Sequence, residues 1–348
     1  MAVHDDPDFS RLPTPLADLF ARAAERSFFA LPLWYHVLAH YGTETGSRVR
    51  LYTDNEARAA LVCRLSHGQH RLLSLSNYYS TEHGPLYATG GTVLRQALGA
   101  IACAITDARY DAVQLAGLDP RDESFAGLVG AFSAAGLRPQ RYFDSGTWYE
   151  ETAGIDFDRY IATRPSALRN TWRRKSKALA AAHRIETVFY DDGAALAEGV
   201  RDYESVYAES WKLAEPFPDF MPHLIRAAAT VGALRLGILK VDGMPAAAQC
   251  WLAWRGRVTI YKLAHATRFD ELSVGTVLTM RMMERVLDRD RPREIDFGRG
   301  DDAYKKSFLA QRRERWGLLI ANPHTLAGRL LAWREAAAGI AKRVLRRG

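Results

Sequence analysis

Residues 293–306 have the sequence Arg-Glu-Ile-Asp-Phe-Gly-Arg-Gly-Asp-Asp-Ala-Tyr-Lys-Lys. Two apolar residues, Ile295 and Phe297, alternate with acidic ones, which is the pattern of a short β-strand with one apolar face. The two glycines around the next arginine allow a turn in which the backbone approaches a ligand closely. The aspartate after them is a suitable N-cap. The stretch therefore predicts a strand at 293–297, a glycine turn and a helix over about 301–310.

Two interpretations of this stretch are open. It is either an ordinary β–α turn with an incidental salt bridge, or a place where a ligand is held and protonated. A turn requires the glycines, but it does not require an arginine, a tyrosine and a lysine beside them. The charged and phenolic residues therefore favour a functional role.

The composition describes a soluble globular protein in a reducing compartment. The chain has 348 residues, 48% hydrophobic and 25% charged, a length that favours two domains. Its cysteines, Cys63, Cys103 and Cys250, are far apart in apolar contexts, as expected of buried small side chains rather than a disulfide or zinc framework. We find neither a signal-peptide pattern nor an apolar run of membrane-spanning length. We expect a cytoplasmic protein without a bound metal.

Two segments carry the net positive charge of +7. Residues 164–184 hold seven basic residues and no acid, and residues 324–348 hold six basic residues and one acid, so the rest of the chain carries −5. A diffuse nucleic-acid surface would spread its charge more evenly. We therefore expect any anionic partner to bind at these two segments.

The predicted elements occur twice in one order. Residues 48–149 predict β-β-β-α-β-α-β, and residues 234–321 repeat this order after two helices at about 193–212 and 219–231. In register, Gly117-Leu-Asp-Pro120 corresponds to Gly298-Arg-Gly-Asp301. This repetition indicates an internal duplication in which only the second copy has the reactive side chains.

The second half resembles the acetyltransferase-like domain of the CelD/BcsL type, a branch of the GNAT superfamily related to the Fem peptidyltransferases. The matching features are the basic segment 166–184, the Glu209-Ser-Trp211 stretch, the hairpin 237–254, the Leu272-Ser-Val-Gly-Thr276 stretch and the 296–305 stretch. Two features depart from the pattern: Val274 stands where a proline is common, and the Q/R-x-x-G-x-G/A signature of ordinary GNAT enzymes does not occur.

The resemblance implies an α/β fold of tandem GNAT-like domains, each a mostly antiparallel twisted sheet flanked by helices. We expect an N-terminal domain at 1–155 that has lost its chemistry, an acyltransferase domain at 156–322, and a basic amphipathic helix at 323–348. Leu326, Leu330, Trp333 and Ala337 begin an apolar stripe in that last segment, which suits an anionic membrane surface, a synthase partner or packing on its own domain.

The donor site is expected where a helix begins at about residue 274. The first amides of a helix have no internal partner, and together with the helix dipole they suit an anion such as a pyrophosphate or the end of a charged tRNA. The candidate donor-binding residues are Ser273, Val274, Gly275 and Thr276. A plain N-cap at Ser273 is the alternative.

Acyl transfer needs a base, a stabilised oxyanion and a proton for the leaving group. Asp296, Asp301 or His265 can accept the proton, Tyr304 can donate one, and Arg299 or Lys305 can hold a phosphate or the oxyanion. Arg169 and Arg173, in the basic segment, and Trp211 are candidate substrate-binding residues. Orientation of the substrates alone can also supply much of the rate.

The residues and the resemblance together predict a GNAT-like acyltransferase, and the resemblance implies acyl-CoA, with acetyl-CoA first, as cosubstrate. The expected acceptor is an amine or hydroxyl on a small molecule, a cell-envelope precursor or an exopolysaccharide precursor. A Fem-like transferase that uses aminoacyl-tRNA and a non-catalytic scaffold for polysaccharide synthesis are the alternatives.

Overall fold

The protein forms two compact units. The structure, a computed structural model, describes residues 2–66, 68, 70–191, 193 and 195–334. Unit 1 comprises Met1–Ser145 and Glu314–Gly348, and unit 2 comprises Gly146–Arg313. The predicted boundaries, 155 and 322, differ from these because strands β7 (Arg138–Glu151) and β13 (Gln311–Ala321) each begin in one unit and end in the other.

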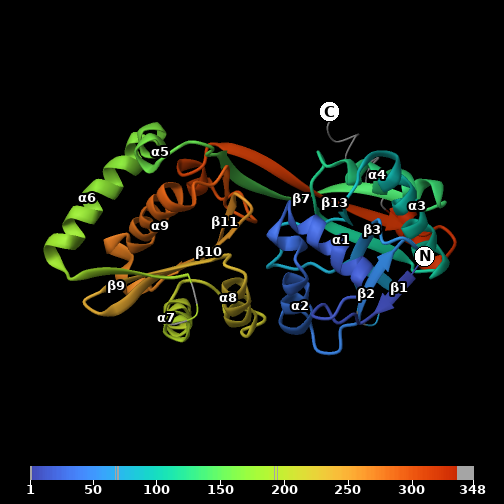
Figure 1. Ribbon diagram of the computed structural model, residues 1–348, viewed down its shortest axis with the longest axis horizontal. Helices are drawn as coiled ribbons and strands as arrows, with labels where there is room; N and C mark the ends of the chain where they lie inside the picture. The colour runs from blue at the N-terminus through green and yellow to red at the C-terminus, as the bar shows by residue number, and fades with distance from the viewer. Residues whose placement is uncertain (1, 67, 69, 192, 194, 335–348) are drawn as a thin grey trace. The chain divides into compact units, whose positions relative to one another are not determined.

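Unit 1 is a mixed sheet flanked by helices (Figure 1). Its strands follow the order β1-β2-β3-β4-β6-β13-β7, and only the β4–β6 pair is parallel among the pairs between β1 and β13. Short β5 pairs with β3. Its elements are β1 (Ala2–Asp5), α1 (Thr14–Ala24), α2 (Pro32–Tyr41), β2 (Val49–Thr53), β3 (Ala59–Leu65), β4 (Arg71–Ser74), β5 (Leu86–Tyr87), α3 (Gly91–Asp107), β6 (Ala112–Leu118) and α4 (Glu123–Ala134).

Unit 2 repeats this arrangement. Its strands follow the order β7-β12-β11-β10-β9-β8, and again only one pair, β11–β12, is parallel. Its elements are α5 (Phe157–Thr163), α6 (Ser166–Ala182), β8 (Ile185–Tyr190), α7 (Leu196–Ala208), α8 (Phe220–Thr230), β9 (Leu234–Val241), β10 (Met244–Trp254), β11 (Arg257–His265), η2 (Thr267–Leu272), α9 (Val274–Arg285), η3 (Val286–Asp290), β12 (Glu294–Asp296) and η4 (Ala303–Ser307).

The two sequence repeats exchange their last strands. In unit 1, β6 pairs with the part of β13 that follows Trp316. In unit 2, β12 pairs with the end of β7, at Tyr149, Glu150 and Glu151. Each sheet is thus completed by a strand from the other repeat, and the mixed α/β fold predicted from the sequence is confirmed.

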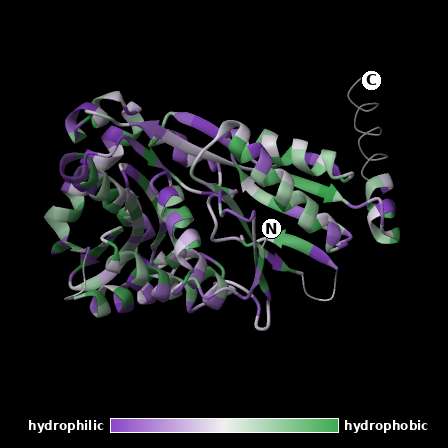
Figure 2. Ribbon diagram, turned by 45° about the vertical axis from the view of Figure 1, so that its right-hand side comes forward, coloured by the Kyte–Doolittle hydropathy of each residue, from purple (hydrophilic) through white to green (hydrophobic). Residues whose placement is uncertain are grey.

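Each unit has its own hydrophobic core. In unit 1, α3 and α4 pack on the sheet through residues such as Leu98 and Phe132. In unit 2, α9 packs on β9 and β10 through Leu278 and Met282, and Trp172 of α6 packs against the same core. Figure 2 shows the resulting alternation of apolar and polar residues along the helices.

Two tight hairpins shape the centre of unit 2. The β9–β10 turn has positive φ angles at Asp242 and Gly243, 52° and 84°, and the β10–β11 turn has them at Arg255 and Gly256, 46° and 76°. Two consecutive positive φ angles are the geometry of type I′ turns, which match the twist of the strands. These turns fix the register that brings β11 beside β12.

One predicted element differs. The helix expected over about 301–310 is instead a single 3₁₀ turn, Ala303–Ser307, after Asp302, and neither Asp301 nor Asp302 makes a capping bond there. The backbone is already held on its other side, because the Gly300 amide bonds to the Gly146 carbonyl at 2.9 Å. Within the described residues, no helix is long and apolar enough to cross a membrane.

Candidate active site

The site lies where β11 and β12 diverge. The strands pair only from Arg257 to Thr259 on β11 and from Glu294 to Asp296 on β12. Beyond Thr259, β11 continues to His265 without pairing to β12. The chain after β12 leads into the loop at 298–301. The helix α9 begins at Val274, shortly after β11 ends. This divergence brings a helix N-terminus close to the end of a central strand.

The first turn of α9 has no side-chain cap. Ser273 takes the left-handed conformation, with φ of 56° and ψ of 35°, and its side chain makes no capping hydrogen bond. The first amides of this helix, those of Val274, Gly275 and Thr276, have no intrahelical acceptor. Together with the helix dipole they form an anion-binding end. The plain N-cap that was the alternative for Ser273 is absent from this structure.

A buried network holds this turn in place. The Gln249 side chain on β10 donates to the Gly275 carbonyl at 3.1 Å and to the Thr279 hydroxyl at 2.8 Å. The Thr279 hydroxyl also donates to the Gly275 carbonyl, and the Trp251 indole donates to Gln249. A network whose buried polar groups bond to one another rigidifies its surroundings. The uncapped first turn therefore lies on a fixed element.

His265 faces this turn. Its Nε2 lies 2.8 Å from Oδ1 of Asp270, and a Cβ placed on Gly275 would lie 3.1 Å from its Nδ1. The Trp211 ring packs on the imidazole, with ring centroids 4.3 Å apart, and remains 54% exposed. Because carboxylate oxygen only accepts, Nε2 carries the proton in neutral His265, and Nδ1 is the basic nitrogen beside Gly275.

A group of lysines adds positive charge next to Trp211. The Lys212 ammonium lies 5.8 Å from the Trp211 ring centroid. Burial, and then the charge of Lys262, lower the pKa of Lys212 to about 8, and the field of Lys305 acts in the same direction. Lys262, itself buried, pairs with Glu215 at 2.9 Å. Lys212 is therefore partly neutral at slightly alkaline pH.

Asp296 is buried and engaged on several sides. It forms an ion pair with Arg313 at 2.7 Å and accepts hydrogen bonds from the Thr147 hydroxyl at 3.0 Å and the Gly298 amide at 2.6 Å. A carboxylate bonded in this way is stabilised in its charged form and fixes the backbone around it. The structure thus gives Asp296 a structural environment rather than that of an accessible base.

In the 299–305 stretch, Lys305 is buried, whereas Arg299 and Asp301 lie at the surface. Lys305 is buried and donates to the carbonyls of Arg299 and Gly300 at 3.0 and 2.9 Å, so it closes the turn. Arg299 is exposed. A hydrogen bond from Arg312 lowers the pKa of Asp301, which weakens that carboxylate as a base.

Tyr304 is half-exposed, and its ring meets Phe297 edge-on at 6.0 Å. Burial, with a smaller effect of Asp302, raises the pKa of Tyr304 to about 12. The phenol is therefore protonated at neutral pH and can donate a hydrogen bond.

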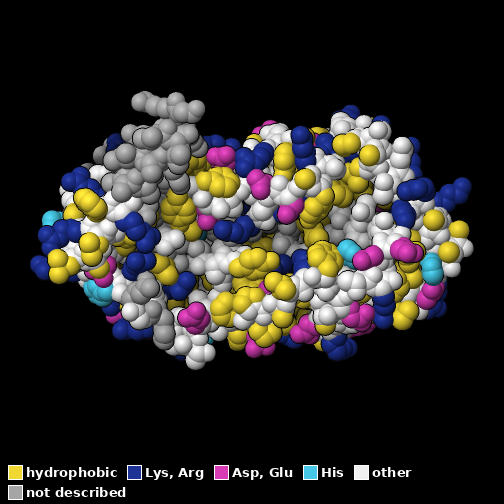
Figure 3. Space-filling model, turned by 180° about the vertical axis from the view of Figure 1, so that it is seen from behind, with side chains coloured by type: hydrophobic (Ala, Val, Ile, Leu, Met, Phe, Trp, Pro, Cys, Tyr) yellow, Lys and Arg dark blue, Asp and Glu magenta, His cyan; other side chains and the backbone are white. Residues whose placement is uncertain are grey.

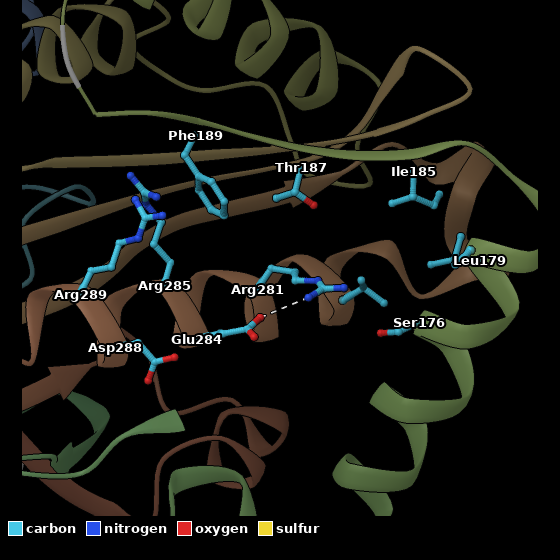
Figure 4. A pocket seen from close by; sticks show the side chains of 12 residues that line it. Ser176, Leu179, Ile185, Thr187, Phe189, Arg281, Glu284, Arg285, Asp288 and Arg289 are labelled. Atoms are coloured by element: carbon cyan, nitrogen blue, oxygen red, sulfur yellow. Dashed lines mark hydrogen bonds and ion pairs between the residues drawn. The ribbon is translucent and has the colours of Figure 1, made fainter. Parts of the chain in front are cut away.

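The basic segment forms the predicted helix α6, but its arginines lie outside the cavity beside it. Arg173 is exposed, and Arg169 is half-buried with a weak bond to the Ala162 carbonyl. The cavity, about 460 Å³, lies between α6, β8 and α9 (Figure 4). In it, Arg281 pairs with Glu284, and Arg285 pairs with Asp191, so much of the charge on this wall is compensated.

In unit 1 the equivalent space is filled. The Gly117 carbonyl, near the end of β6, accepts a hydrogen bond from the His83 amide at 3.0 Å. Arg315 holds Glu82 at 2.7 Å, next to this residue. Protein backbone therefore occupies the divergence between β4 and β6.

Four residues of this region are not among the candidates predicted from the sequence: Lys212, Lys262, Gln249 and Asp270. Lys262 and Gln249 were detectable as polar residues inside apolar strands, a pattern that indicates a site or a buried network. The roles of Lys212 and Asp270 depend on loop geometry that no short-range pattern encodes.

Comparison with known proteins identifies the domain that carries this site. Residues 166–306 match the family model described as Acetyltransferase (GNAT) domain. The matched segment runs from α6 into η4, and the predicted resemblance to the GNAT superfamily is confirmed at the level of this family model. The search of curated proteins found no match.

Solved structures share the fold of nearly the whole chain. FemX has a TM-score of 0.61 at 11% identity, with 91% of this chain and 97% of FemX covered. L-PGS from Bacillus licheniformis has a TM-score of 0.54 at 12% identity, covering 89% and 92%. A conserved protein of unknown function from Bacteroides thetaiotaomicron has a TM-score of 0.56 at 12% identity, covering 90% and 98%. At these identities the likeness shows the fold alone.

Proposed function

We propose that the chain is an acyltransferase that moves an acyl group to an amine or hydroxyl at the divergence of β11 and β12. The observation that carries this proposal is the rigidly held first turn of α9, which has no side-chain cap and lies beside the His265–Asp270 pair within the segment that matches the GNAT family model. The amides of Val274, Gly275 and Thr276 bind the anionic part of the acyl donor.

His265 is the proposed base. In the reaction the acceptor nitrogen or oxygen forms a bond to the acyl carbon and gives its proton to Nδ1 of His265, while the bond to the leaving group breaks. Asp270 holds the imidazole in the required tautomer and stabilises its cationic form. His265 was one of three bases considered from the sequence, and the surroundings of Asp296 and Asp301 favour it over both.

The lysines and Tyr304 supply the remaining chemistry. Lys212 and Lys262 place positive charge near the site, where it stabilises an oxyanion or an anionic substrate. Tyr304, protonated at neutral pH, donates a proton to the leaving thiolate or ribose oxygen. Trp211, exposed beside His265, forms an apolar wall for the acceptor.

Acyl-CoA, with acetyl-CoA first, is the proposed donor. This choice follows from the resemblance of the sequence to GNAT domains of the CelD/BcsL type. An aminoacyl-tRNA donor is the second candidate. It draws support from the fold shared with FemX and with L-PGS, and from the two basic segments of the sequence. The acceptor is proposed to be a cell-envelope or exopolysaccharide precursor, again from the resemblance. A non-catalytic scaffold is the third candidate.

Mass spectrometry of the native protein, followed by a turnover assay, tests the proposal. We expect bound CoA, acyl-CoA or tRNA in the purified protein, and slow release of free CoA from acetyl-CoA with a panel of amines. His265→Gln should lower kcat at least 100-fold, within the range for loss of a general base, and Asp270→Asn should lower it less.

His183→Gln is the matched control, because His183 forms a second His–Asp pair, with Asp242 at 2.7 Å, beside the β9–β10 turn. Equal activity of the His265 and His183 variants would remove His265 from the mechanism. Turnover with charged tRNA and none with acyl-CoA would select the second donor. Absence of binding to either donor class, with capture of polysaccharide synthase subunits, would favour the scaffold.

A further inference from the structure

The chain after β13 forms a helix that is fixed to unit 1. This helix covers residues 326–334 of the described chain. Just before it, the Asn322 amide donates to the Asp111 carbonyl at 3.0 Å, and the Asn322 side chain donates to the Tyr110 carbonyl at 2.8 Å. The Thr325 hydroxyl accepts a hydrogen bond from the Gly328 amide at 3.1 Å, which caps the helix. The helix therefore has a defined start.

A glycine determines which side of the helix faces the protein. Gly328 is buried, and a Cβ there would overlap the Asn322 carbonyl and lie 2.6 Å from the Asp111 carbonyl oxygen. Leu331, one turn later, lines a cavity of about 300 Å³ with Leu319 and Tyr142. At Gly328 the helix lies so close to the Asn322 and Asp111 carbonyls that no side chain fits between them. The helix therefore cannot rotate to bury another face.

The opposite side presents large apolar side chains to solvent. Leu326, Leu330 and Trp333 stand at i, i+4 and i+7, and are 74%, 73% and 80% exposed. This spacing places them on one helical stripe. A helix of a water-exposed surface normally carries polar residues there, so this stripe indicates a surface that is covered by something else.

The positive charge near this stripe favours an anionic binding partner. Residues 324–348 contain six Arg and Lys residues and one Glu, against a net negative charge for the chain outside this segment and 164–184. On the described helix, Arg329 is exposed, Arg334 lines the same cavity as Leu331, and residues 335–348 lie outside the described residues. On the face drawn in Figure 3, by contrast, basic and acidic side chains are interspersed over most of the surface.

We propose that the stripe Leu326–Leu330–Trp333 inserts into the surface of an anionic phospholipid bilayer. Leucine and tryptophan enter the boundary between headgroups and acyl chains, and arginines beside them attract anionic headgroups. The fixed helix would bind with its axis along the membrane plane, which holds unit 1 at the membrane surface. This assignment goes beyond acyl transfer and does not depend on the identity of the donor.

Sedimentation of the full chain with vesicles tests the assignment. We expect binding to vesicles of phosphatidylcholine with one quarter phosphatidylglycerol, little binding to pure phosphatidylcholine, and weaker binding at high salt. The Leu330→Ser/Trp333→Ser double variant should bind at least 10-fold more weakly. Met244→Ser is the control, because Met244 is a 45% exposed apolar side chain in unit 2.

Two results would overturn the assignment. One is equal vesicle binding by the wild type and the double variant, or no binding by either at low salt. The other is a concentration-dependent dimer in solution that the double variant abolishes, since the stripe would then be a contact between copies of the chain. Acyl transfer with soluble substrates is measured separately, so its presence or absence does not decide this test.

Discussion

Lys212 illustrates how the fold changes the chemistry of a single residue. Its ammonium is half-buried beside Trp211, and its pKa falls to about 8 through burial and the positive charge of Lys262, partly offset by Glu215. Below pH 8 it is a cation that can hold an anionic substrate, and above pH 8 this charge is lost. A lysine in water would remain charged over this whole range.

A pH profile of kcat/KM tests the role of Lys212. For the wild type we expect kcat/KM to fall as the pH rises through about 8. Lys212→Arg keeps the positive charge to much higher pH, because the guanidinium does not titrate there, so the decline should move to more alkaline pH. Lys306→Arg, a change at an exposed lysine, is the control. An unchanged decline in the Lys212→Arg variant would assign it to another group.

Unlike Lys212, Lys305 has the contacts of a structural residue. Lys305→Met should leave the carbonyls of Arg299 and Gly300 without their donor and lower the free energy of unfolding by about 1–3 kcal/mol. Lys306→Met should change it by less than about 0.5 kcal/mol. Urea denaturation measures both. Full stability of Lys305→Met with a large loss of activity would instead restore the catalytic role expected from the sequence.

At the scale of one element, α9 combines support and function. Its interior packs on the sheet through Leu278 and Met282, and its first turn is fixed by Gln249 and has no side-chain cap. Gly275 is the close contact between this turn and His265. An added methyl group would press on the imidazole and on the space the donor requires.

Gly275→Ala should therefore lower kcat/KM at least 10-fold while the melting temperature is unchanged or higher. The stability expectation follows because alanine is favoured over glycine in helices by about 0.5–1 kcal/mol. Gly99→Ala is the matched control, since Gly99 lies in α3 and a Cβ there would meet no atom within 4 Å. Normal kcat/KM for Gly275→Ala would contradict the proposed donor position.

The sequence predicted elements well where a periodic pattern or a strong turn signal was present. The Asp242-Gly243 turn and strand 234–241 are examples. The prediction of a helix over about 301–310 was wrong, and the structure has a 3₁₀ turn at 303–307. The Lys305 ammonium bonds to the Gly300 carbonyl and the Gly300 amide bonds to Gly146, and these contacts replace ordinary helix bonding. The lysine group around Lys212 was missed because it assembles from a loop, a strand and a turn that are far apart in the chain.

At the scale of the whole molecule, β13 links the two repeats. Leu318 and Ile320 on β13 are buried in the core of unit 1, although they follow unit 2 in the sequence. The stability of unit 1 therefore depends on residues that are about 200 positions away from its other strands.

Truncation tests this dependence. Ending the chain at residue 313 should expose the β6 amides to hydrogen exchange and make unit 1 sensitive to protease, because its core loses two buried side chains and a paired strand. Ending it after Pro323 keeps β13 and Asn322 and should preserve protection of β6. Equal protection in both truncated proteins would show that β13 contributes little to unit 1.

The exchange of strands also sets the order in which the protein can fold on the ribosome. β6 is complete once Leu118 has been synthesised, but its antiparallel neighbour begins only at Trp316. At roughly 5–20 residues per second, this delay of roughly 200 residues lasts on the order of 10–40 s. During that time the edge of β6 is unpaired, and an unpaired edge is where nascent chains pair wrongly with one another. Unit 1 starts first and finishes last, so its folding yield should depend on translation speed and on chaperones more than that of unit 2.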